Sequence, residues 1–298
     1  MASQLRFQVL TLPGRPWSGY REQVLRVERL GFDTVAIPDH FCDWANPPAP
    51  WLECWALMAA LAVETTTIRL ATNVVQIPLR HPGVLAHQAV TVDQISGGRV
   101  ELGLGTGLTI DPGTEMIGLP NWSPAERVAR FGEYVELLGL LLSQEVTTYA
   151  GTYYRAAGAV MNPSSVQSPR LPIVAAALGP RMMRHAARLA DGWNTMSFSP
   201  DFDVQLAELC ERNAHMDRLC QEVGRDPATL RRSVNLFDAQ ARAAGGRLRL
   251  YDDPDLLVRL VTQLRDAGYH EFGVYYPSDP AQLDAFERIA TEVIPGLR

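Results

Sequence analysis

The sequence predicts a (β/α)8 barrel with insertion loops at the carboxyl ends of its strands, built as one domain over residues 1–298. Short apolar runs alternate with longer amphipathic stretches eight times, and the composition does not change between the two halves of the chain. Several runs are apolar almost throughout, as the strands of a buried parallel sheet are. A doubly wound α/β sheet is the main alternative, because it produces the same alternation.

The spacing of apolar residues assigns each segment to a strand or a helix, since helices repeat every three to four residues and buried strands are short and continuous. Strands are expected at residues 5–11, 33–38, 68–77, 99–107, 171–178, 192–197, 230–239 and 271–277. Helices are expected at residues 20–31, 53–65, 82–98, 123–143, 180–190, 203–224, 254–268 and 281–295.

Local signals mark two of these helices. The helix at 82–98 has a proline at its start and a glycine past its end, which is the usual asymmetry. Ser123, followed three residues later by Glu126, predicts a capping box at the start of the helix 123–143.

Three connections are long, and long loops in compact domains are usually functional. Residues 108–122 form an extended loop, and residues 144–170 are an insertion with a small hairpin expected around 148–154. Residues 241–249 are open to two interpretations, a mobile lid or a linker.

Composition excludes several classes of protein. A net charge of −6 without a basic patch argues against nucleic-acid binding, and no apolar run reaches the roughly 18 residues of a membrane helix. Four scattered cysteines indicate a reduced, cytoplasmic protein, and no metal-ligand spacing is visible among them and the six histidines. Motifs typical of serine hydrolases, zinc proteases and P-loop enzymes are missing from the sequence.

Asp39 and His40 directly follow a predicted strand, at the end of the barrel where catalytic residues collect. His40 is the natural candidate for proton transfer, because imidazole changes its charge near neutral pH. Asp39 could orient this ring or bind a ligand, and Trp44 could form the wall of a pocket. The alternative for a lone histidine is a purely structural role.

Two glycine-containing strand exits are also expected at this end. The segment GLGTG at 103–107 predicts a tight turn or a close approach to a planar ligand, and Leu108 stands where a dinucleotide fingerprint needs its last glycine. Gly179 and Pro180 open a predicted helix whose N-terminus, with Arg181, suits a phosphate. An ordinary turn with proline at the first helical position explains the same residues.

Five stretches together resemble the bacterial-luciferase-like flavin-dependent oxidoreductases, the luciferase-like monooxygenase superfamily. They are GFDTVAIPDHF (31–41), TTIRLATNV (66–74), HPGVLAHQAVTVDQ (81–94), SGGRVELGLGTG (96–107) and LPIVAAALGPRMMRHAARLADGWN (171–194). The resemblance spans residues 5–277 and implies a (β/α)8 barrel. Within the superfamily, the DHF and ALGP stretches resemble the branch that uses the deazaflavin coenzyme F420.

The resemblance also implies roles for individual residues. Asp39 and His40 would lie at the deazaflavin ring, with His40 near the hydride-carrying carbon and Trp44 as its catalytic neighbour. A non-prolyl cis peptide at Asn73–Val74 would support the ring. The remaining residues expected to bind the coenzyme, the last five of them at its phosphate, are Gly105, Thr106, Gly107, Ala176, Ala177, Leu178, Gly179, Pro180 and Arg181.

One position departs from the sugar-phosphate dehydrogenases of this branch, which have a glutamate directly after GTG, where this chain has Leu108. An acidic proton relay is therefore expected to be missing, and the small-molecule substrate is expected to be apolar. Its pocket is expected to include Trp44, Leu108, Trp122, Trp193, Met196 and Tyr275, although each of these could simply pack in the core or in a loop.

Two other functions stay open. One is an FMN-dependent monooxygenase of the same superfamily that uses molecular oxygen, and the other is a coenzyme-binding protein without turnover. The resemblance also implies a homodimer through helices such as 53–65, although this apolar helix could equally be part of the core.

Overall fold

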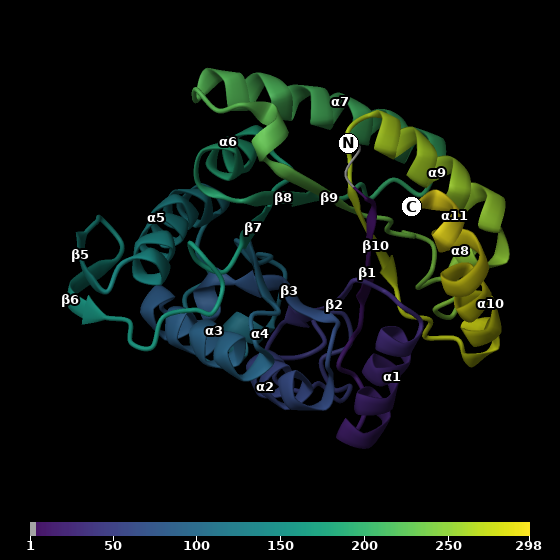
Figure 1. Ribbon diagram of the computed structural model, residues 1–298, viewed down its shortest axis with the longest axis horizontal. Coiled ribbons are helices and arrows are strands. Elements are labelled where there is room, and N and C mark those ends of the chain that lie inside the picture. The colour runs from purple at the N-terminus through teal and green to yellow at the C-terminus, as the bar shows by residue number, and fades with distance from the viewer. Residues whose placement is uncertain (1–3) are drawn as a thin grey trace.

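A closed barrel of parallel strands forms the centre of the computed structural model, which describes residues 4–298 (Figure 1). Around the barrel the strands follow the order β1-β10-β9-β8-β7-β4-β3-β2, and every neighbouring pair is parallel. The eight strands are β1 (Arg6–Leu10), β2 (Thr34–Asp39), β3 (Arg69–Gln76), β4 (Val100–Gly105), β7 (Ile173–Ala176), β8 (Gly192–Thr195), β9 (Arg231–Asn235) and β10 (Glu271–Tyr275). The predicted barrel is confirmed, and the doubly wound alternative is wrong.

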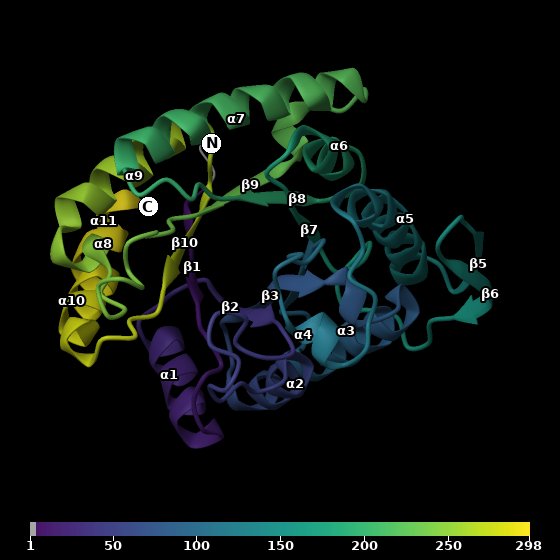
Figure 2. The ribbon, with the colours of Figure 1, turned by 180° about the vertical axis from the view of Figure 1, so that it is seen from behind.

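Helices surround the strands on the outside, as the view from behind also shows (Figure 2). The helices that follow the first seven strands are α1 (Trp17–Arg29), α2 (Cys54–Glu64), α3 (Pro82–Ser96), α5 (Pro124–Ser143), α6 (Pro180–Leu189), α7 (Phe202–Glu222) and α9 (Pro254–Asp266). The last predicted helix is present in three successive parts, α10 (Leu283–Arg288), a π-helical turn (Ile289–Val293) and α11 (Ile294–Leu297). None of the helices within residues 4–298 combines the length and the apolar character that crossing a bilayer requires.

The predicted helix signals are confirmed in α3 and only partly in α5. Gly97 ends α3 in the left-handed conformation, with a φ of 67°. Ser123 accepts a hydrogen bond of 3.3 Å from the backbone N–H of Glu126. In a full capping box the Glu126 carboxylate would in turn accept a hydrogen bond from the backbone N–H of Ser123. Here it accepts one from Arg130, one turn later in the helix.

The long connections also have defined structures. Residues 146–160 form the expected hairpin, in which β5 (Val146–Ala150) pairs antiparallel with β6 (Arg155–Val160) and projects at the left of Figure 1. The loop 108–122 contains the short helix α4 (Gly113–Met116). The segment 241–249 leads into α8 (Arg249–Asp252) and reaches the loop after β2, where Arg242 donates a hydrogen bond of 2.5 Å to the carbonyl of Ala45.

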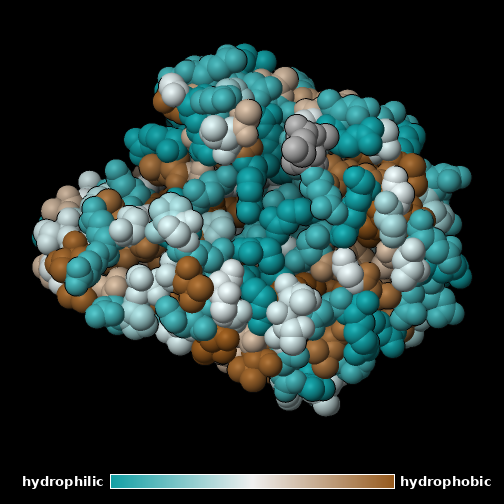
Figure 3. Space-filling view, in the orientation of Figure 1, coloured by the Kyte–Doolittle hydropathy of each residue, from teal (hydrophilic) through white to brown (hydrophobic). Residues whose placement is uncertain are grey.

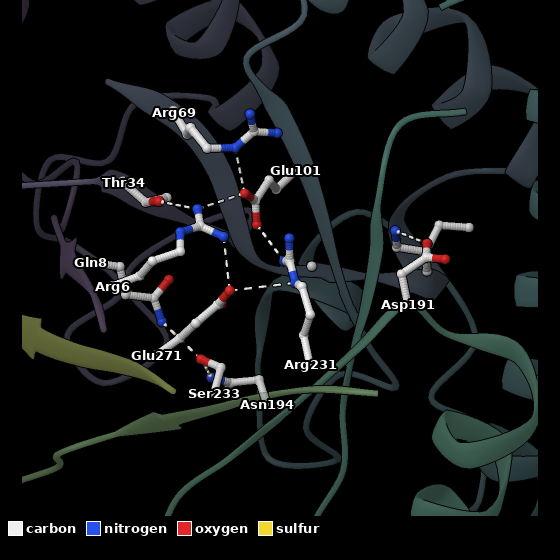
Figure 4. A network of polar contacts seen from close by, with 12 residues as sticks. Arg6, Gln8, Thr34, Arg69, Glu101, Asp191, Asn194, Arg231, Ser233 and Glu271 are labelled. Carbon is white, nitrogen blue, oxygen red and sulfur yellow. Dashed lines mark hydrogen bonds and ion pairs between the residues drawn. The ribbon is translucent and has the colours of Figure 1, made fainter. Parts of the chain in front are cut away.

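A cluster of five charged residues closes the amino-terminal end of the barrel (Figure 4). Glu101 on β4 accepts hydrogen bonds from Arg6 and Arg231, each at 2.7 Å, and from Arg69. Glu271 on β10 accepts a further bond of 2.8 Å from Arg6. Burial alone would raise the pKa of Glu101, but the three guanidinium groups lower that pKa to about 2. Glu101 is therefore a carboxylate at neutral pH, although it is buried.

The next layer of the interior, above the charged cluster, is made of uncharged polar side chains. Asn235 is its centre and accepts hydrogen bonds from Gln8 at 3.1 Å, Asn194 at 3.2 Å and Asn73 at 3.3 Å. Ser233 accepts another from Asn194 at 2.8 Å. Polar residues on the strands therefore point into the barrel, and their apolar neighbours point outward to the helices.

The face in view in Figure 3 is largely hydrophilic, and its apolar side chains lie in separate groups rather than in one patch. One group lies over the projecting hairpin at the left, where Val146 and Val160 are exposed and opposite each other across the strand pair. Scattered exposed apolar residues of this kind are normal on a protein surface.

Candidate active site at the carboxyl end of the barrel

Asp39 is the last residue of β2, and its buried carboxylate pairs with the guanidinium of Arg80. A second bond joins the Nη2 atom of Arg80 to the other carboxylate oxygen at 3.2 Å. The expectation that Asp39 could orient the imidazole of His40 is therefore wrong, because its oxygens are directed to Arg80. A different carboxylate takes that place.

His40 lies directly after β2 and pairs with Asp111, which comes from the long loop after β4. The Nδ1 atom of His40 is 2.6 Å from the Oδ2 atom of Asp111. Trp51 stands edge-on to the imidazole, with ring centroids 5.9 Å apart, and its indole N–H donates a bond of 3.0 Å to the His40 carbonyl. The ring of His40 is thus held from two sides.

The amide of Gln76, at the end of β3, joins the same group. Its Nε2 atom lies 2.8 Å from Asp111 Oδ2, 3.2 Å from the carbonyl of Asp39 and 2.8 Å from His40 Nδ1. An amide nitrogen has two hydrogens, and the carboxylate and carbonyl oxygens accept both of them. Nδ1 is therefore left to donate its own hydrogen to Asp111.

Asp111 is only 2% exposed but has three hydrogen-bond donors. Burial by itself raises the pKa of this carboxyl, yet hydrogen bonds from His40, Gln76 and the backbone N–H of Gly113 outweigh burial and place the pKa below its ordinary value. Asp111 is accordingly a carboxylate at neutral pH. This buried carboxylate lies three residues after Leu108 in the chain.

The peptide bond between Asn73 and Val74 is cis, as the family resemblance implies. The side chain of Asn73 points into the barrel and bonds to Asn235, which explains a polar residue in an otherwise apolar strand. The register between β3 and β4 shifts at this place. There the Thr72 hydroxyl donates a hydrogen bond of 2.8 Å to the carbonyl of Gly103 and accepts one of 2.9 Å from the N–H of Gly103.

The glycines at the end of β4 make room for side chains of β3. A Cβ atom on Gly105 would lie 2.6 Å from Val74 Cγ2, and one on Gly107 would lie 2.5 Å from Gln76 Oε1 and 2.8 Å from Arg127 Nη1. Gly107 also has a φ of +75°, a conformation that other residues rarely adopt. Packing against β3 is therefore sufficient to explain the glycine spacing, and Thr106 between them exposes part of its surface to the mouth of the barrel.

The start of α6 offers a set of donors for an anion. Ala176 ends β7, Ala177 is buried, and Leu178, Gly179, Pro180 and Arg181 are exposed in succession. Within residues 4–298, no side chain caps the first turn of α6, and Arg181 takes part in no ion pair. Free N–H groups at a helix N-terminus together with a guanidinium fit the chemistry of a phosphate group.

Trp193 does not line the mouth, so the prediction that it walls the substrate pocket is wrong. It is 0% exposed, donates a hydrogen bond of 2.9 Å to the carbonyl of Ala177 and packs against Tyr269 at 5.9 Å. The next residue, Asn194, points into the barrel, and side chains alternate along a strand. Trp193 therefore faces the layer between sheet and helices.

The other predicted pocket residues lie near the ends of strands or in loops. Met196 comes just after β8 and is partly exposed, and Trp44 and Leu108 are exposed in the loops after β2 and β4. Trp122 lies at the end of the loop 108–122, 4.2 Å from the guanidinium of Arg130. This guanidinium also contacts Tyr153 at 4.4 Å, so Trp122 connects the loop to the hairpin.

Tyr275, the last residue of β10, begins a row of aromatic rings that leads outward from the barrel. Its ring is 5.9 Å from Phe237, and Phe237 is 5.5 Å from Phe198, which is 58% exposed. Inside the barrel Tyr275 packs on Leu10 and two alanines. The row thus joins the interior of the barrel to its rim.

Exposed apolar side chains gather in the loops that follow the strands. Nine of them are at least 39% exposed, namely Leu12, Phe41, Trp44, Leu108, Ile110, Met116, Ile117, Leu178 and Phe198. Such a concentration at one end of a barrel is typical of a binding site rather than of random surface.

Sequence reasoning missed Asp111, Gln76 and Trp51. Asp111 lies in a loop that was expected to be functional because of its length, and Gln76 is a polar residue near the end of an apolar strand, as Asn73 is. The length of the loop and the presence of a polar residue in an apolar strand could have identified Asp111 and Gln76 as candidates. Nothing in the sequence pattern indicates that the ring of Trp51, rather than that of Trp44, contacts His40.

Comparison with known proteins agrees with this architecture. Residues 2–244 match the model of the luciferase-like monooxygenase family. A relative from Intrasporangium calvum, named F420-dependent glucose-6-phosphate dehydrogenase, is 27% identical over 93% of this chain and 94% of its own length. Two solved structures are similar in fold. One is the coenzyme F420-dependent tetrahydromethanopterin reductase from Methanopyrus kandleri, with a TM-score of 0.79, 21% identity and coverage of 99% of this chain and 100% of the other.

The second structure is a monooxygenase from Streptomyces bottropensis, with a TM-score of 0.76 and 23% identity, covering 99% of this chain and 100% of the other. These identities are low, so the two structures support the fold alone. The family model, in contrast, covers most of the chain, including β1 to β9 and the loop that supplies Asp111. The chain therefore belongs to the luciferase-like monooxygenase family.

Proposed function

We propose that this protein is a coenzyme F420-dependent oxidoreductase that moves a hydride between the deazaflavin and an apolar organic substrate. The observation that carries the proposal is the His40–Asp111 pair, which places a proton-exchanging imidazole among exposed apolar side chains at the mouth of the barrel. Support for the coenzyme comes from the curated relative, which is named as F420-dependent and aligns with 93% of the chain.

The residues present fit this coenzyme. When bound, its deazaflavin ring supplies the hydride-carrying carbon. The exposed start of α6, residues Ala177 to Arg181, would hold the phosphate, with Ala176 beside it. The ring would lie against Asp39, His40, the Asn73–Val74 peptide and the strand exit from Gly105 to Gly107.

His40 is assigned the proton transfer that accompanies hydride transfer. Its Nε2 atom has no hydrogen-bond partner within residues 4–298, so this nitrogen is free to give or take a proton. Trp44 lies four residues later in the same loop and would wall the site. A general acid or base of this kind typically contributes about 10²–10⁴-fold to the rate.

The substrate is assigned as apolar for two reasons. Exposed apolar side chains gather in the loops that follow the strands, and a row of aromatic rings leads from Tyr275 through Phe237 to Phe198. Met196, Trp122, Leu108 and Tyr275 remain candidate pocket residues, and Phe198 and Phe237 join them. A series of substrates with a lengthening alkyl chain tests this assignment. Burial of one CH₂ group contributes about 0.8 kcal/mol, so kcat/KM should rise up to about fourfold per carbon. Efficient turnover of glucose 6-phosphate instead, with no gain along the series, would contradict an apolar pocket.

The coenzyme is tested by titrating the purified protein with F420 and, in parallel, with FMN while following tryptophan fluorescence. We expect micromolar binding of F420 and no binding of FMN. The variant Arg181→Met should weaken F420 binding about tenfold, because a charge-assisted contact to phosphate is lost. Arg184→Met, on the next turn of the same helix, is the matched control, since Arg184 is exposed and pairs with Glu222.

An FMN-dependent monooxygenase is the second candidate, and the family model favours it because its description names monooxygenases. Preferential binding of FMN, together with oxygen consumption in the presence of reduced FMN, would establish this function in place of the first. A coenzyme-binding protein without turnover is the third candidate. Binding of F420 without activity across the alkyl series would favour it.

Two further properties are proposed. The four cysteines are free, which fits a cytoplasmic protein with a reducing environment. A homodimer would use the outer face of α2, where Val63 is 76% exposed. Size-exclusion chromatography with light scattering tests the dimer, and Val63→Glu should convert it into a monomer. A wild-type protein of monomer mass would exclude it.

A further inference from the structure

Two loops meet at the imidazole of His40. His40 belongs to the loop after β2 and Asp111 to the loop after β4, 71 residues further along the chain, yet their side chains share a hydrogen bond of 2.6 Å. A carboxylate has no hydrogen to donate, so the bond requires the hydrogen to be on Nδ1. In neutral His40 the lone pair must then be on Nε2, the nitrogen without a partner in the part of the chain that the structure describes.

The amide of Gln76 supports this direction of the bond. Both hydrogens of its amide nitrogen are used by Asp111 Oδ2 and the Asp39 carbonyl. The opposite orientation of the amide would point Oε1 at two acceptors, which is unfavourable. The surroundings therefore stabilise one tautomer of His40 and one ionisation state of Asp111.

We propose that Asp111 is a positioning residue that holds His40 as the Nδ1–H tautomer and stabilises its imidazolium form when Nε2 carries the exchanged proton. This inference rests on the proposed function, and it assigns a role to an acid that lies three residues after Leu108. In the oxidising direction, an O–H or N–H bond of the substrate breaks and its proton passes to Nε2, while a hydride passes from the adjacent carbon to the coenzyme. The reducing direction is the reverse, so atoms and electrons balance.

Hydrogen bonds within its own loop also hold Asp111 in place. The other carboxylate oxygen, Oδ1, accepts a hydrogen bond of 2.8 Å from the N–H of Gly113, at the start of α4. Thr114 donates a further bond of 3.3 Å to the carbonyl of Asp111. Asp111 is thus held by its own backbone as well as by its side chain, as a positioning group requires.

The first test is the ¹⁵N spectrum of the imidazole rings in the protein without coenzyme. The chain has six histidines, and the loss of one signal in His40→Gln assigns the ring. We expect the Nδ1–H pattern for His40 in the wild type and a shift toward the Nε2–H pattern in Asp111→Asn. The Nε2–H pattern in the unmodified protein would overturn the proposal, even if the variant did not fold.

The second test is kinetic and uses Glu115→Gln as the control, since Glu115 is an exposed acid in the same loop. Asp111→Asn should lower kcat by about 10²–10⁴-fold and leave the dissociation constant of F420 within a factor of three. The midpoint of the acidic limb of its pH–rate profile should move to lower pH, and Asp111→Glu should recover part of the activity. A normal kcat in Asp111→Asn, or an equal loss in Glu115→Gln, would overturn the proposal.

The two tests separate the proposal from the function on which it rests. If the wild type does not bind F420 but its ¹⁵N spectrum changes in Asp111→Asn, the proposed function fails and the positioning of His40 by Asp111 stands. If F420 binds and turns over but the spectrum is unchanged, the positioning role fails alone.

Discussion

The Nη1 atom of Arg127, on the first turn of α5, donates a hydrogen bond of 2.7 Å to the carbonyl oxygen of Thr106, at the end of β4. The same guanidinium bonds the carbonyl of Trp122 at 3.0 Å and the side chain of Asn121 at 2.7 Å. Arg127 is only 2% exposed and forms no ion pair with any residue from 4 to 298. Its function is therefore to tie together the two ends of the loop that contains Asp111.

Replacing Arg127 should loosen this loop. Arg127→Met removes three hydrogen bonds to groups that the loop cannot satisfy otherwise, and we expect a loss of about 1–3 kcal/mol in the free energy of unfolding. Amide hydrogen exchange should accelerate in residues 107–122 and stay unchanged in the hairpin. Arg127→Lys should behave similarly, because an ammonium group cannot reproduce the planar fork. Unaltered exchange in the loop for both variants would contradict this role.

Two glycines of the same loop form a matched pair. Gly107 and Gly118 have φ values of +75° and +72°, so alanine is strained at both. At Gly118 nothing lies within 4 Å of the new methyl group, whereas at Gly107 the methyl group would lie 2.5 Å from Gln76. We expect Gly118→Ala to cost about 1 kcal/mol and Gly107→Ala to cost about 1–3 kcal/mol more. Thermal unfolding measures both, and equal costs would refute the packing explanation.

The sequence predicted the barrel well because its strands and helices have different periods, and those periods do not depend on tertiary contacts. All eight strands are confirmed, and β2 extends one residue further than expected, to Asp39. The placement of Trp193 was wrong for a related reason. Along β8 a shift of one residue reverses the face. The ring of Trp193, the second residue of this strand, was assigned to the mouth although its neighbour Asn194 occupies the inward position.

The partner of His40 could not be predicted in the same way. Asp39 is adjacent in sequence, but Arg80 binds it, and Asp111 is brought in by a loop with no periodic pattern. The path of that loop depends on hydrogen bonds from Arg127 and Gly113 that only the folded chain contains. Site residues on strands were therefore easier to place than those on loops.

Removing the imidazole of His40 should affect chemistry far more than folding. His40→Ala is expected to lower kcat by about 10²–10⁴-fold while the midpoint of thermal unfolding and the dissociation constant of F420 change little. His87→Ala is the control, because His87 is exposed on α3. Steady-state kinetics and a coenzyme titration on both variants provide the measurement. Unchanged turnover in His40→Ala would show that another group exchanges the proton.

The charged cluster at the other end of the barrel should control stability at low pH. The pKa of Glu101 is lowered from 4.5 to about 2 in the folded protein. A lowered folded-state pKa contributes stability above the unfolded pKa and loses it as the pH falls toward the folded value. The shift corresponds to about 3 kcal/mol, which is fully present at pH 7 and disappears between about pH 4.5 and 2.

Glu101→Gln should therefore lower the free energy of unfolding at pH 7 by about 3–5 kcal/mol, since it leaves Arg6 and Arg231 with Glu271 and removes the carboxylate that pairs with Arg69. The difference between wild type and variant should shrink as the pH falls from 5 to 3. Urea unfolding at several pH values measures it. Glu22→Gln, which breaks an exposed pair with Arg29, is the control and should leave stability almost unchanged at every pH. A constant difference between wild type and Glu101→Gln would mean that the Glu101 carboxylate does not titrate differently in the folded and unfolded chain.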